Sequence, residues 1–263
     1  MIWFIVYLAF VGLVVGSAIN AIVWRIHVKL SWARGRSQCP GCGHELAARD
    51  LVPVASWVLL GGRCRYCRRR ISRQYPLVEL LTAGLFALSA AILPVLTPMD
   101  QWAFALWLAI LTLLIILSVY DLKWMLLPDR IMLSAITLGL VYVVSVILPS
   151  HGLASAGSYC LAALGAGGFF YAIAAFSGGR AMGGGDIKLA FLMGLVLSPW
   201  RLMAAMEIGF ISAAAVGIVL LACGRLKRGA HLPFGPFLVL GTITAFFYGG
   251  QIIDWYIKIS GIN

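Results

Sequence analysis

Charged residues are scarce in this sequence, and acidic residues are the scarcest. Only nine of the 263 residues are Asp or Glu, and charged residues make up 11% of the chain against 62% hydrophobic residues. A soluble domain of this length needs a more polar surface, so the composition excludes an ordinary soluble protein. Because carboxylates are so few, each one at the boundary of an apolar run is informative about function.

Low-complexity linkers and long internal repeats are also missing. The sequence instead has apolar runs of about twenty residues, the length that crosses a bilayer core of roughly 30 Å. We therefore predict an all-α polytopic membrane protein with about eight transmembrane helices. The predicted segments are 2–24, 76–96, 101–120, 130–148, 154–176, 187–199, 202–223 and 234–254. The sixth is short and ends at Pro199, so a tilted or re-entrant course there would invert everything that follows.

The orientation of these segments is predicted from Lys and Arg. No basic residue precedes the first run, which is long enough to span, so we expect a membrane helix there and not a cleaved signal peptide. With the N-terminus outside, eighteen of the twenty Lys and Arg residues fall on the cytosolic side. This distribution follows the positive-inside rule and predicts that both termini lie outside.

Four of the six cysteines form two CxxC pairs separated by twenty-one residues, namely Cys39, Cys42, Cys64 and Cys67. This spacing is typical of a closed, structural zinc site with four thiolate ligands. Disulfides or free thiols are the alternatives, and the predicted cytosolic, reducing location argues against disulfides. His44 is a further ligand candidate or a neighbour of the site, but the sequence favours a solvated surface histidine. Cys160 and Cys223 lie in or at apolar runs and are expected to be packing residues.

The cysteine pairs lie in a polar insertion, residues 25–75, which also carries eleven basic residues. We predict three parts: a first transmembrane helix at 1–24, a cytosolic zinc-binding domain at 25–75 and a transmembrane core at 76–263. A basic zinc domain can bind nucleic acid. Attachment to a membrane favours contact with anionic lipid headgroups instead, so membrane lipid and no nucleic acid is the predicted partner.

Asp121 and Asp186 are the candidate catalytic residues. Asp121 follows one apolar run and Asp186, in a Gly-Gly-Gly-Asp sequence, precedes another, and both are predicted on the cytosolic side. Two carboxylates that share one proton are the minimum equipment of an aspartyl hydrolase. The alternatives are that Asp186 N-caps a helix beginning at Ile187 and that Asp121 is an ordinary interfacial acid. Asp129 is a third candidate that we interpret as a helix cap.

An ordered set of motifs over nearly the whole chain resembles the type IV prepilin peptidases, also called prepilin leader peptidase/N-methyltransferases. Ala18 departs from the pattern, where the family commonly has Phe. The matching motifs are Gly16-Ser17-Ala18-Ile19-Asn20 with Arg25, both CxxC pairs, Asp50-Leu51-Val52-Pro53 with Ser56-Trp57, Ile71-Ser72 with Tyr75-Pro76 and Glu79, Asp121 with Leu127-Pro128-Asp129, the run Met182 to Leu189 that contains the GxGD motif, and Pro233 to Leu238.

The resemblance implies an activity and its sites. The family's aspartyl catalytic pair would be Asp121 and Asp186, and its substrates are prepilins and pseudopilins of type IV pilus or type II secretion systems. They are cleaved at the bacterial inner membrane, on the cytosolic side, after a glycine that ends a basic leader. Many members then methylate the new N-terminus with S-adenosyl-L-methionine, a function linked to the zinc domain. We find no Rossmann-type glycine fingerprint for that cofactor.

Three other functions stay open at this point. A GxGD-type intramembrane protease with other substrates would use the same aspartates, although the four-cysteine insertion favours the prepilin type. A proton-coupled transporter could use the two aspartates as a relay, but repeated halves are not evident. A noncatalytic scaffold anchored by a zinc domain would tolerate Asp186→Asn, whereas a protease would not.

Overall fold

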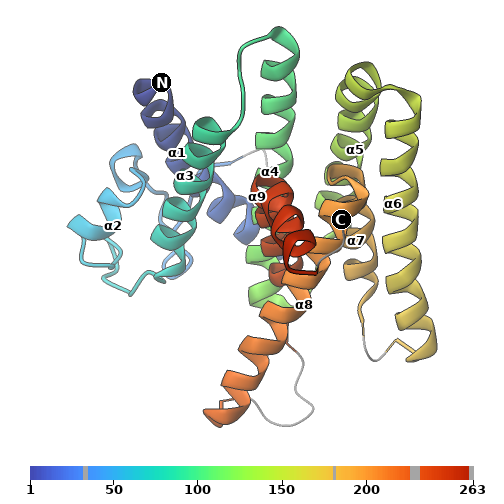
Figure 1. Cartoon of the computed structure of the whole chain (residues 1–263). Coiled ribbons are helices and arrows are strands. Elements are labelled where there is room, and N and C mark those ends of the chain that lie inside the picture. The colour runs from blue at the N-terminus through green and yellow to red at the C-terminus, as the bar shows by residue number, and fades with distance from the viewer. Residues whose placement is uncertain (32–34, 180–181, 226–231, 261–263) are drawn as a thin grey trace. The chain divides into compact units, whose positions relative to one another are not determined.

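The computed structural model describes the chain except residues 32–34, 180–181, 226–231 and 261–263. The described residues contain helices and no β-strand, as Figure 1 shows. The helices are α1 (Ile2–His27), the short 3-10 helix η1 (Ala48–Asp50), α2 (Ala55–Leu59), α3 (Gln74–Ile92), α4 (Pro98–Trp124), α5 (Asp129–Tyr142), the π-helical turn η2 (Val143–Ile147), α6 (Leu148–Phe176), α7 (Gly184–Val196), α8 (Pro199–Ala222) and α9 (Gly235–Ser260).

Six helical segments among the described residues are long and apolar enough to cross a membrane. The longest, Asp129–Phe176, has 48 residues and bends where Gly152 adopts a φ of +81°, so it accounts for two predicted segments. Each predicted segment coincides with a helix, which confirms the all-α membrane fold. However, α7 has 13 residues and a length of about 20 Å, too short to cross alone.

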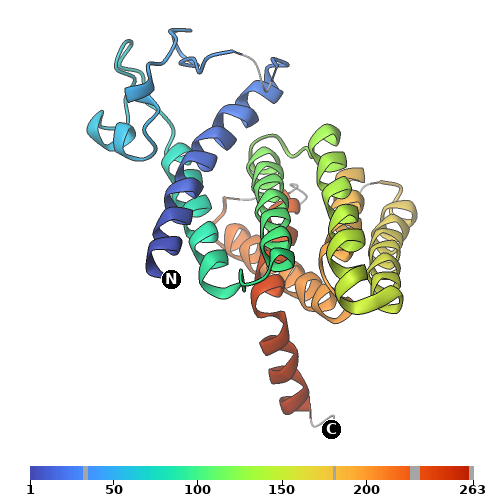
Figure 2. The same cartoon turned by 90° about the horizontal axis from the view of Figure 1, so that it is seen from above.

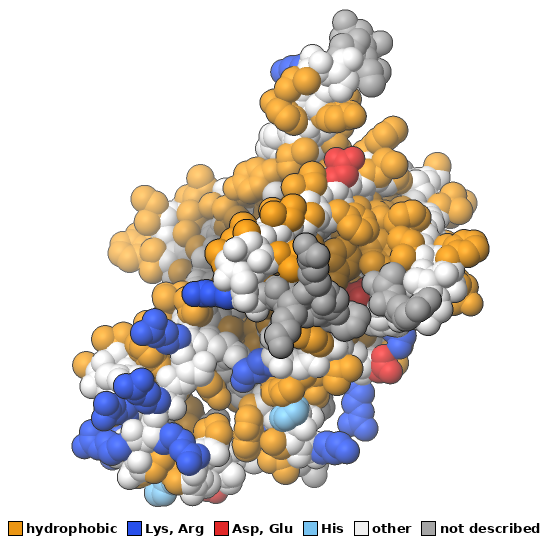
Figure 3. Space-filling model, turned by 90° about the horizontal axis from the view of Figure 1, so that it is seen from below, with side chains coloured by type: hydrophobic (Ala, Val, Ile, Leu, Met, Phe, Trp, Pro, Cys, Tyr) orange, Lys and Arg blue, Asp and Glu red, His pale blue; other side chains and the backbone are white. Residues whose placement is uncertain are grey.

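The surface agrees with a membrane location. Figure 3 shows hydrophobic side chains over much of one face, with many Lys and Arg side chains gathered in one part of it. The cytosolic orientation of those basic residues stays a prediction. Arg34, Arg180, Lys227 and Arg228, which contribute to it, lie outside the described residues.

Contacts divide the chain into two compact units, Met1–Leu96 and Thr97–Asn263. In the first unit, α1 and α3 lie side by side in both Figure 1 and Figure 2. Their close approach depends on Gly12 and Gly16, because a Cβ at Gly16 would lie 2.6 Å from the Cα of Glu79. Small residues four apart let helix backbones meet in this way inside membranes.

The second unit is built around α4. A reciprocal capping box between Thr97 and Asp100 starts this helix, with Pro98 at its first position. Its side chains are then buried on most sides, and the Trp107 ring stacks on Phe246 of α9 with 3.5 Å between ring centroids. The central position of α4 fixes the depth of its last turn, which carries Asp121.

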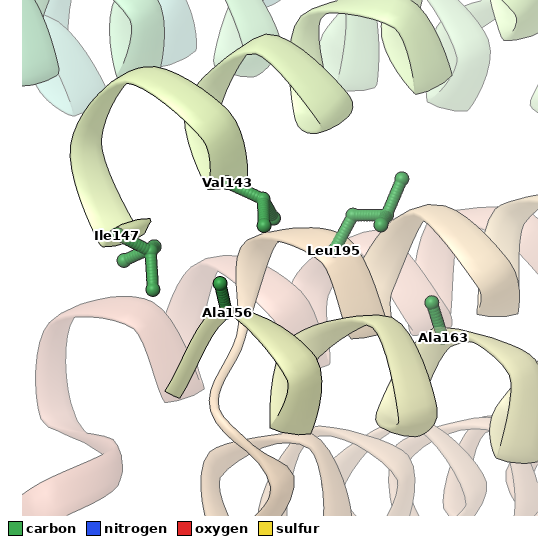
Figure 4. Packing of buried hydrophobic residues seen from close by; sticks show 5 residues of the cluster. All are labelled: Val143, Ile147, Ala156, Ala163 and Leu195. Atoms are coloured by element: carbon green, nitrogen blue, oxygen red, sulfur yellow. The ribbon is translucent and has the colours of Figure 1, made fainter. Parts of the chain in front are cut away.

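The helix α7 is enclosed by its neighbours. Figure 4 shows Leu195 of α7 beside Val143 and Ile147 from η2 and Ala156 and Ala163 from α6. Any side chain at Gly194 would collide with the backbone at Ala163, so α6 and α7 can pack only with a glycine there. This packing positions the start of α7, where Asp186 lies.

Candidate functional site

Asp121 lies in the last turn of α4 and is buried, with 5% of its surface exposed. The sequence placed it just after a segment ending at residue 120. The helix instead continues to Trp124 and ends where Met125 adopts a left-handed φ of +52°. One carboxylate oxygen, Oδ2, accepts a hydrogen bond from the backbone N–H of Gly235 at 3.0 Å. The start of α9 therefore holds Asp121 through Gly235, for which no role was predicted.

Asp186 occupies the third position of α7. The alternative that it N-caps a helix beginning at Ile187 is wrong, because α7 begins at Gly184 and Gly183 is the N-cap. The Asp186 carboxylate reaches back and accepts from the Gly183 N–H at 3.4 Å. This arrangement satisfies a free amide at the helix start and restrains the carboxylate.

The two carboxylates interact electrostatically. Asp186 lies outside the helices that are long enough to span a membrane. Burial, together with the negative charge of Asp121, raises the pKa of Asp186 to about 6, although the hydrogen bond from the Gly183 N–H acts in the opposite direction. A raised pKa favours the protonated form, so Asp186 holds its proton to a higher pH than an ordinary aspartate. The pair thus has the electrostatic coupling that proton sharing requires.

Leu127 packs between the two glycines beside these carboxylates. A Cβ at Gly185 would lie 2.8 Å from the Leu127 Cβ, and one at Gly235 would lie 2.7 Å from Asp121 Oδ2. Any larger residue at either position must displace Leu127 or the Asp121 carboxylate. The glycines are therefore required by close approach and not only for loop flexibility.

Asp129 does not cap α5, contrary to the prediction. Pro128 is the N-cap, and Asp129 is the first helical residue, without a side-chain cap. Its carboxylate instead pairs with the Lys188 ammonium at 2.5 Å, joining the starts of α5 and α7. Both side chains are largely exposed, so this pair contributes at most about 1 kcal/mol. Asp129 is thus separate from the Asp121–Asp186 pair.

The four predicted cysteines converge in the first unit. Their sulfur atoms lie within 4.8 Å of one another, which makes the cluster a candidate metal centre. The two cysteine pairs adopt matching turns. In the first, the Cys39 N–H donates to the His44 carbonyl oxygen and the Gly43 N–H donates to the Cys39 carbonyl oxygen. In the second, the Cys64 N–H donates to the Arg69 carbonyl oxygen and the Arg68 N–H donates to the Cys64 carbonyl oxygen. The left-handed positions of these turns are Gly43 and Arg68.

The cluster fits zinc. Tetrahedral Zn–S bonds of about 2.3 Å place the sulfurs about 3.8 Å apart. The sulfurs of Cys39 and Cys67 are 3.9 Å apart. The Gly41 N–H also donates to the Cys39 sulfur at 3.4 Å, and such a donor favours the thiolate form that binds metal. His44 is not part of the cluster; its ring packs on Tyr66 with 3.7 Å between centroids.

Asp50 supports the turn that carries Cys64 and Cys67, and this role was not predicted. Its carboxylate accepts from Arg65 Nε at 2.7 Å and from the Tyr66 hydroxyl at 3.0 Å. The hydrogen bond from Arg65 is the largest cause that lowers the pKa of Asp50. Asp50 therefore stays ionised and holds the residues between Cys64 and Cys67 in place.

Comparison with known proteins identifies the family. The prepilin leader peptidase/N-methyltransferase of Bacillus subtilis (strain 168) is 34% identical over 258 residues, covering 95% of this chain and 96% of that protein. The chain belongs to the type IV leader peptidase family. The model of this family matches residues 108–221, and that of the bacterial peptidase A24 N-terminal domain matches residues 10–93.

Other relatives in the type IV leader peptidase family are similarly distant. A prepilin leader peptidase/N-methyltransferase of Pectobacterium carotovorum subsp. carotovorum is 30% identical, covering 94% of each chain. The type 4 prepilin-like proteins leader peptide-processing enzyme of Escherichia coli O78:H11 is 33% identical, covering 90% of this chain and 91% of the relative. No solved structure matches this chain. The matched N-terminal region contains the cysteine cluster, and the second contains both aspartates.

Removing the charge of Asp121 should lower the pKa of Asp186, because that charge is one cause of its elevation. A hydrophobic carbodiimide reacts with protonated carboxyl groups, so its pH-dependent labelling of Asp186 reports this pKa. We expect Asp121→Asn to move the labelling midpoint to lower pH, and Asp129→Asn to leave it in place. An unchanged or higher midpoint in Asp121→Asn would contradict the coupling.

Substitution of Gly235 should misplace the Asp121 carboxylate. A Cβ there would lie 2.7 Å from Oδ2, so the side chain must move. Displacing a reacting group by about 1 Å can cost about 100-fold in rate, and we expect a loss of that order in kcat for Gly235→Ala. Gly217→Ala is the matched control, because a Cβ at Gly217 meets nothing within 4 Å. Equal rates for the two variants would refute the positioning role.

Proposed function

We propose that this chain is a membrane aspartyl endopeptidase that removes the basic leader from type IV prepilins or pseudopilins and then methylates the new N-terminus. The observation that carries the peptidase is the buried Asp121 with its electrostatically coupled neighbour Asp186. The names of the relatives, leader peptidase and N-methyltransferase, support both activities.

The two carboxylates take different roles in the proposed hydrolysis. Asp121 accepts the Gly235 N–H and carries the negative charge, whereas Asp186 carries the shared proton. Asp121 takes a proton from water as its oxygen attacks the scissile carbonyl carbon, and Asp186 gives its proton to the carbonyl oxygen. As the C–N bond breaks, the proton on Asp121 passes to the leaving amine and Asp186 regains its own. The chemistry uses the protein's own acid–base pair.

The insertion 25–75 is the proposed zinc-binding domain, with Cys39, Cys42, Cys64 and Cys67 as ligands. Four thiolates close the coordination sphere, so Zn²⁺ would stabilise the fold and would not activate water. S-adenosyl-L-methionine is the proposed methyl donor of the second activity. The transmembrane core, 76–263, is the proposed peptidase.

The proposed location is the bacterial inner membrane, with the zinc domain and the aspartates facing the cytosol. The six candidate spans support a multi-pass protein. The eleven basic residues of 25–75 would face anionic lipid headgroups, and no nucleic acid partner is proposed. A prepilin, with a basic leader ahead of an apolar helix, presents its cleavage site at this boundary.

Asp121→Asn and Asp186→Asn should each abolish cleavage. Loss of an acid or base that acts on the reacting atoms costs about 100- to 10,000-fold. Mass spectrometry of a prepilin incubated with purified enzyme and S-adenosyl-L-methionine measures leader loss and methylation in one sample. Asp129→Asn, outside the pair, should cleave within about tenfold of the wild type. Near-normal turnover by either active-site variant would remove that residue from the mechanism.

Removal of the metal should unfold residues 25–75 while leaving the helices of Thr97–Asn263 folded. Structural zinc contributes folding free energy directly, and the insertion has little other core. We expect elemental analysis of the wild type to give one zinc per chain. The Cys39→Ser/Cys64→Ser double variant should contain no zinc, and its residues 25–75 should become sensitive to protease. Cys160→Ser, outside the cluster, should retain zinc. Wild-type protein that never contains zinc would refute the assignment.

A further inference from the structure

Besides Asp121, a second buried carboxylate lies in the first unit, Met1–Leu96, and the proposed hydrolysis does not use it. Glu79 of α3 is 6% exposed, and its Oε2 atom accepts a hydrogen bond from the Val54 N–H at 2.7 Å. The Ser17 hydroxyl of α1 also hydrogen-bonds the carboxylate. A carboxylate has about four acceptor positions, so two remain available. No described Lys, Arg or His side chain forms an ion pair with Glu79.

An unpaired acceptor lies on the same seam between α1 and α3. Asn20 is 3% exposed, and its amide nitrogen donates to the backbone oxygens of Gly16 and Tyr75 at 3.2 and 3.1 Å. Its amide oxygen, Oδ1, is buried without a partner among the described residues. Tyr75 is one helical turn from Glu79, so the Asn20 amide group contacts α3 one turn from the residue that carries the carboxylate. A buried acceptor without a donor is costly and rare in proteins.

The loop that donates to Glu79 is strained. Val54 has φ +60° and ψ −51°, a region that β-branched residues avoid. Its neighbours close a tight turn, since Ala55 N–H donates to the Pro53 oxygen, as in the rare classic γ-turn. The strain directs the Val54 N–H at the carboxylate. Such strain persists where the surroundings enforce it, and it is concentrated at functional sites.

We propose that Glu79 and Asn20 form a binding site for a primary ammonium group, the new N-terminal amine of the cleaved substrate. This inference rests on the proposed methyl-transfer function. An ammonium group brings one positive charge and three donors, whereas the seam offers a buried carboxylate with spare acceptor positions and an unpaired amide oxygen. The ammonium group would therefore supply the donors and the positive charge, and the residues between α1 and α3 would supply the acceptors and the negative charge.

Glu79 also supplies the proton acceptor that methyl transfer needs. An ammonium has no lone pair, so it must first lose a proton, and Glu79 takes it. S-adenosyl-L-methionine supplies the methyl group: its C–S bond breaks with the electron pair staying on sulfur, and an N–C bond forms. The product leaves as a methylammonium, and Glu79 returns its proton to water.

Binding of a mature pilin N-terminal segment to the purified full chain, without methyl donor, tests the site directly. We expect the wild type to bind the free-amine segment at least about tenfold more tightly than its N-acetylated form. Glu79→Gln should bind both forms equally. Glu79→Asp, which keeps the negative charge, should retain most of the preference. Equal binding of both forms by the wild type would overturn the proposal.

Mass spectrometry of the same variants with a prepilin and S-adenosyl-L-methionine separates the two activities. Glu79→Gln should cleave within about threefold of the wild type and methylate about 100-fold more slowly, with a raised KM for the pilin. Glu207→Gln, the same change at an exposed acid of α8, is the matched control and should methylate near the normal rate.

The outcomes distinguish this inference from the proposed function. If the wild type cleaves no prepilin, the proposed function fails. If the wild type cleaves and methylates, three results overturn the inference alone. These are normal methylation by Glu79→Gln, a parallel loss of cleavage and methylation, and a raised KM for the donor instead of the pilin, which would assign the site to the donor's amino group.

Discussion

Backbone amides, and not cationic side chains, hold the carboxylates that carry the proposed chemistry. Gly235 donates to Asp121, Gly183 to Asp186 and Val54 to Glu79. A Lys or Arg partner would hold each carboxylate more strongly, but it would also compensate the charge that must exchange protons or bind a cation. A neutral N–H fixes the orientation and leaves that charge available. At Val54 this requirement coincides with a strained backbone conformation.

The same requirement explains the glycines. For the Gly235 N–H to reach Asp121 on another helix, the two backbones must come close, and a Cβ at Gly235 would prevent this. A Cβ at Gly16 would likewise push α1 away from α3. The exposed acid Asp129 is held by an ion pair and not by a backbone amide. Asp129, at the surface, is paired with Lys188, as is usual for a solvated carboxylate. Backbone amides therefore hold the acids that are proposed to do chemistry, whereas ion pairs hold Asp129 and Asp50, which join parts of the structure.

Much of the architecture and of the candidate site could be predicted from the sequence. Apolar runs predicted the helices because membrane spans have a required length, and the CxxC spacing predicted the cysteine cluster because metal geometry constrains its ligands. The aspartates were conspicuous because acids are rare here. The partners of these acids could not be predicted, since a backbone amide leaves no trace in a residue pattern. The N-cap alternative for Asp186 was wrong for this reason, because the amide to which its carboxylate reaches back belongs to a glycine.

The short helix α7 has a consequence for the setting of the reaction. Its residues from Leu189 onward are largely buried, and Leu197, where it ends, is 1% exposed. Irregular backbone at membrane depth is tolerated only where protein covers it, and here the Leu197 N–H still donates to Met193 at 2.9 Å. Asp186 therefore stands on a helix insulated from lipid, much like a core helix of a soluble protein. Its depth is set by protein packing, so bilayers of different thickness leave the carboxylate at the same height relative to Asp121.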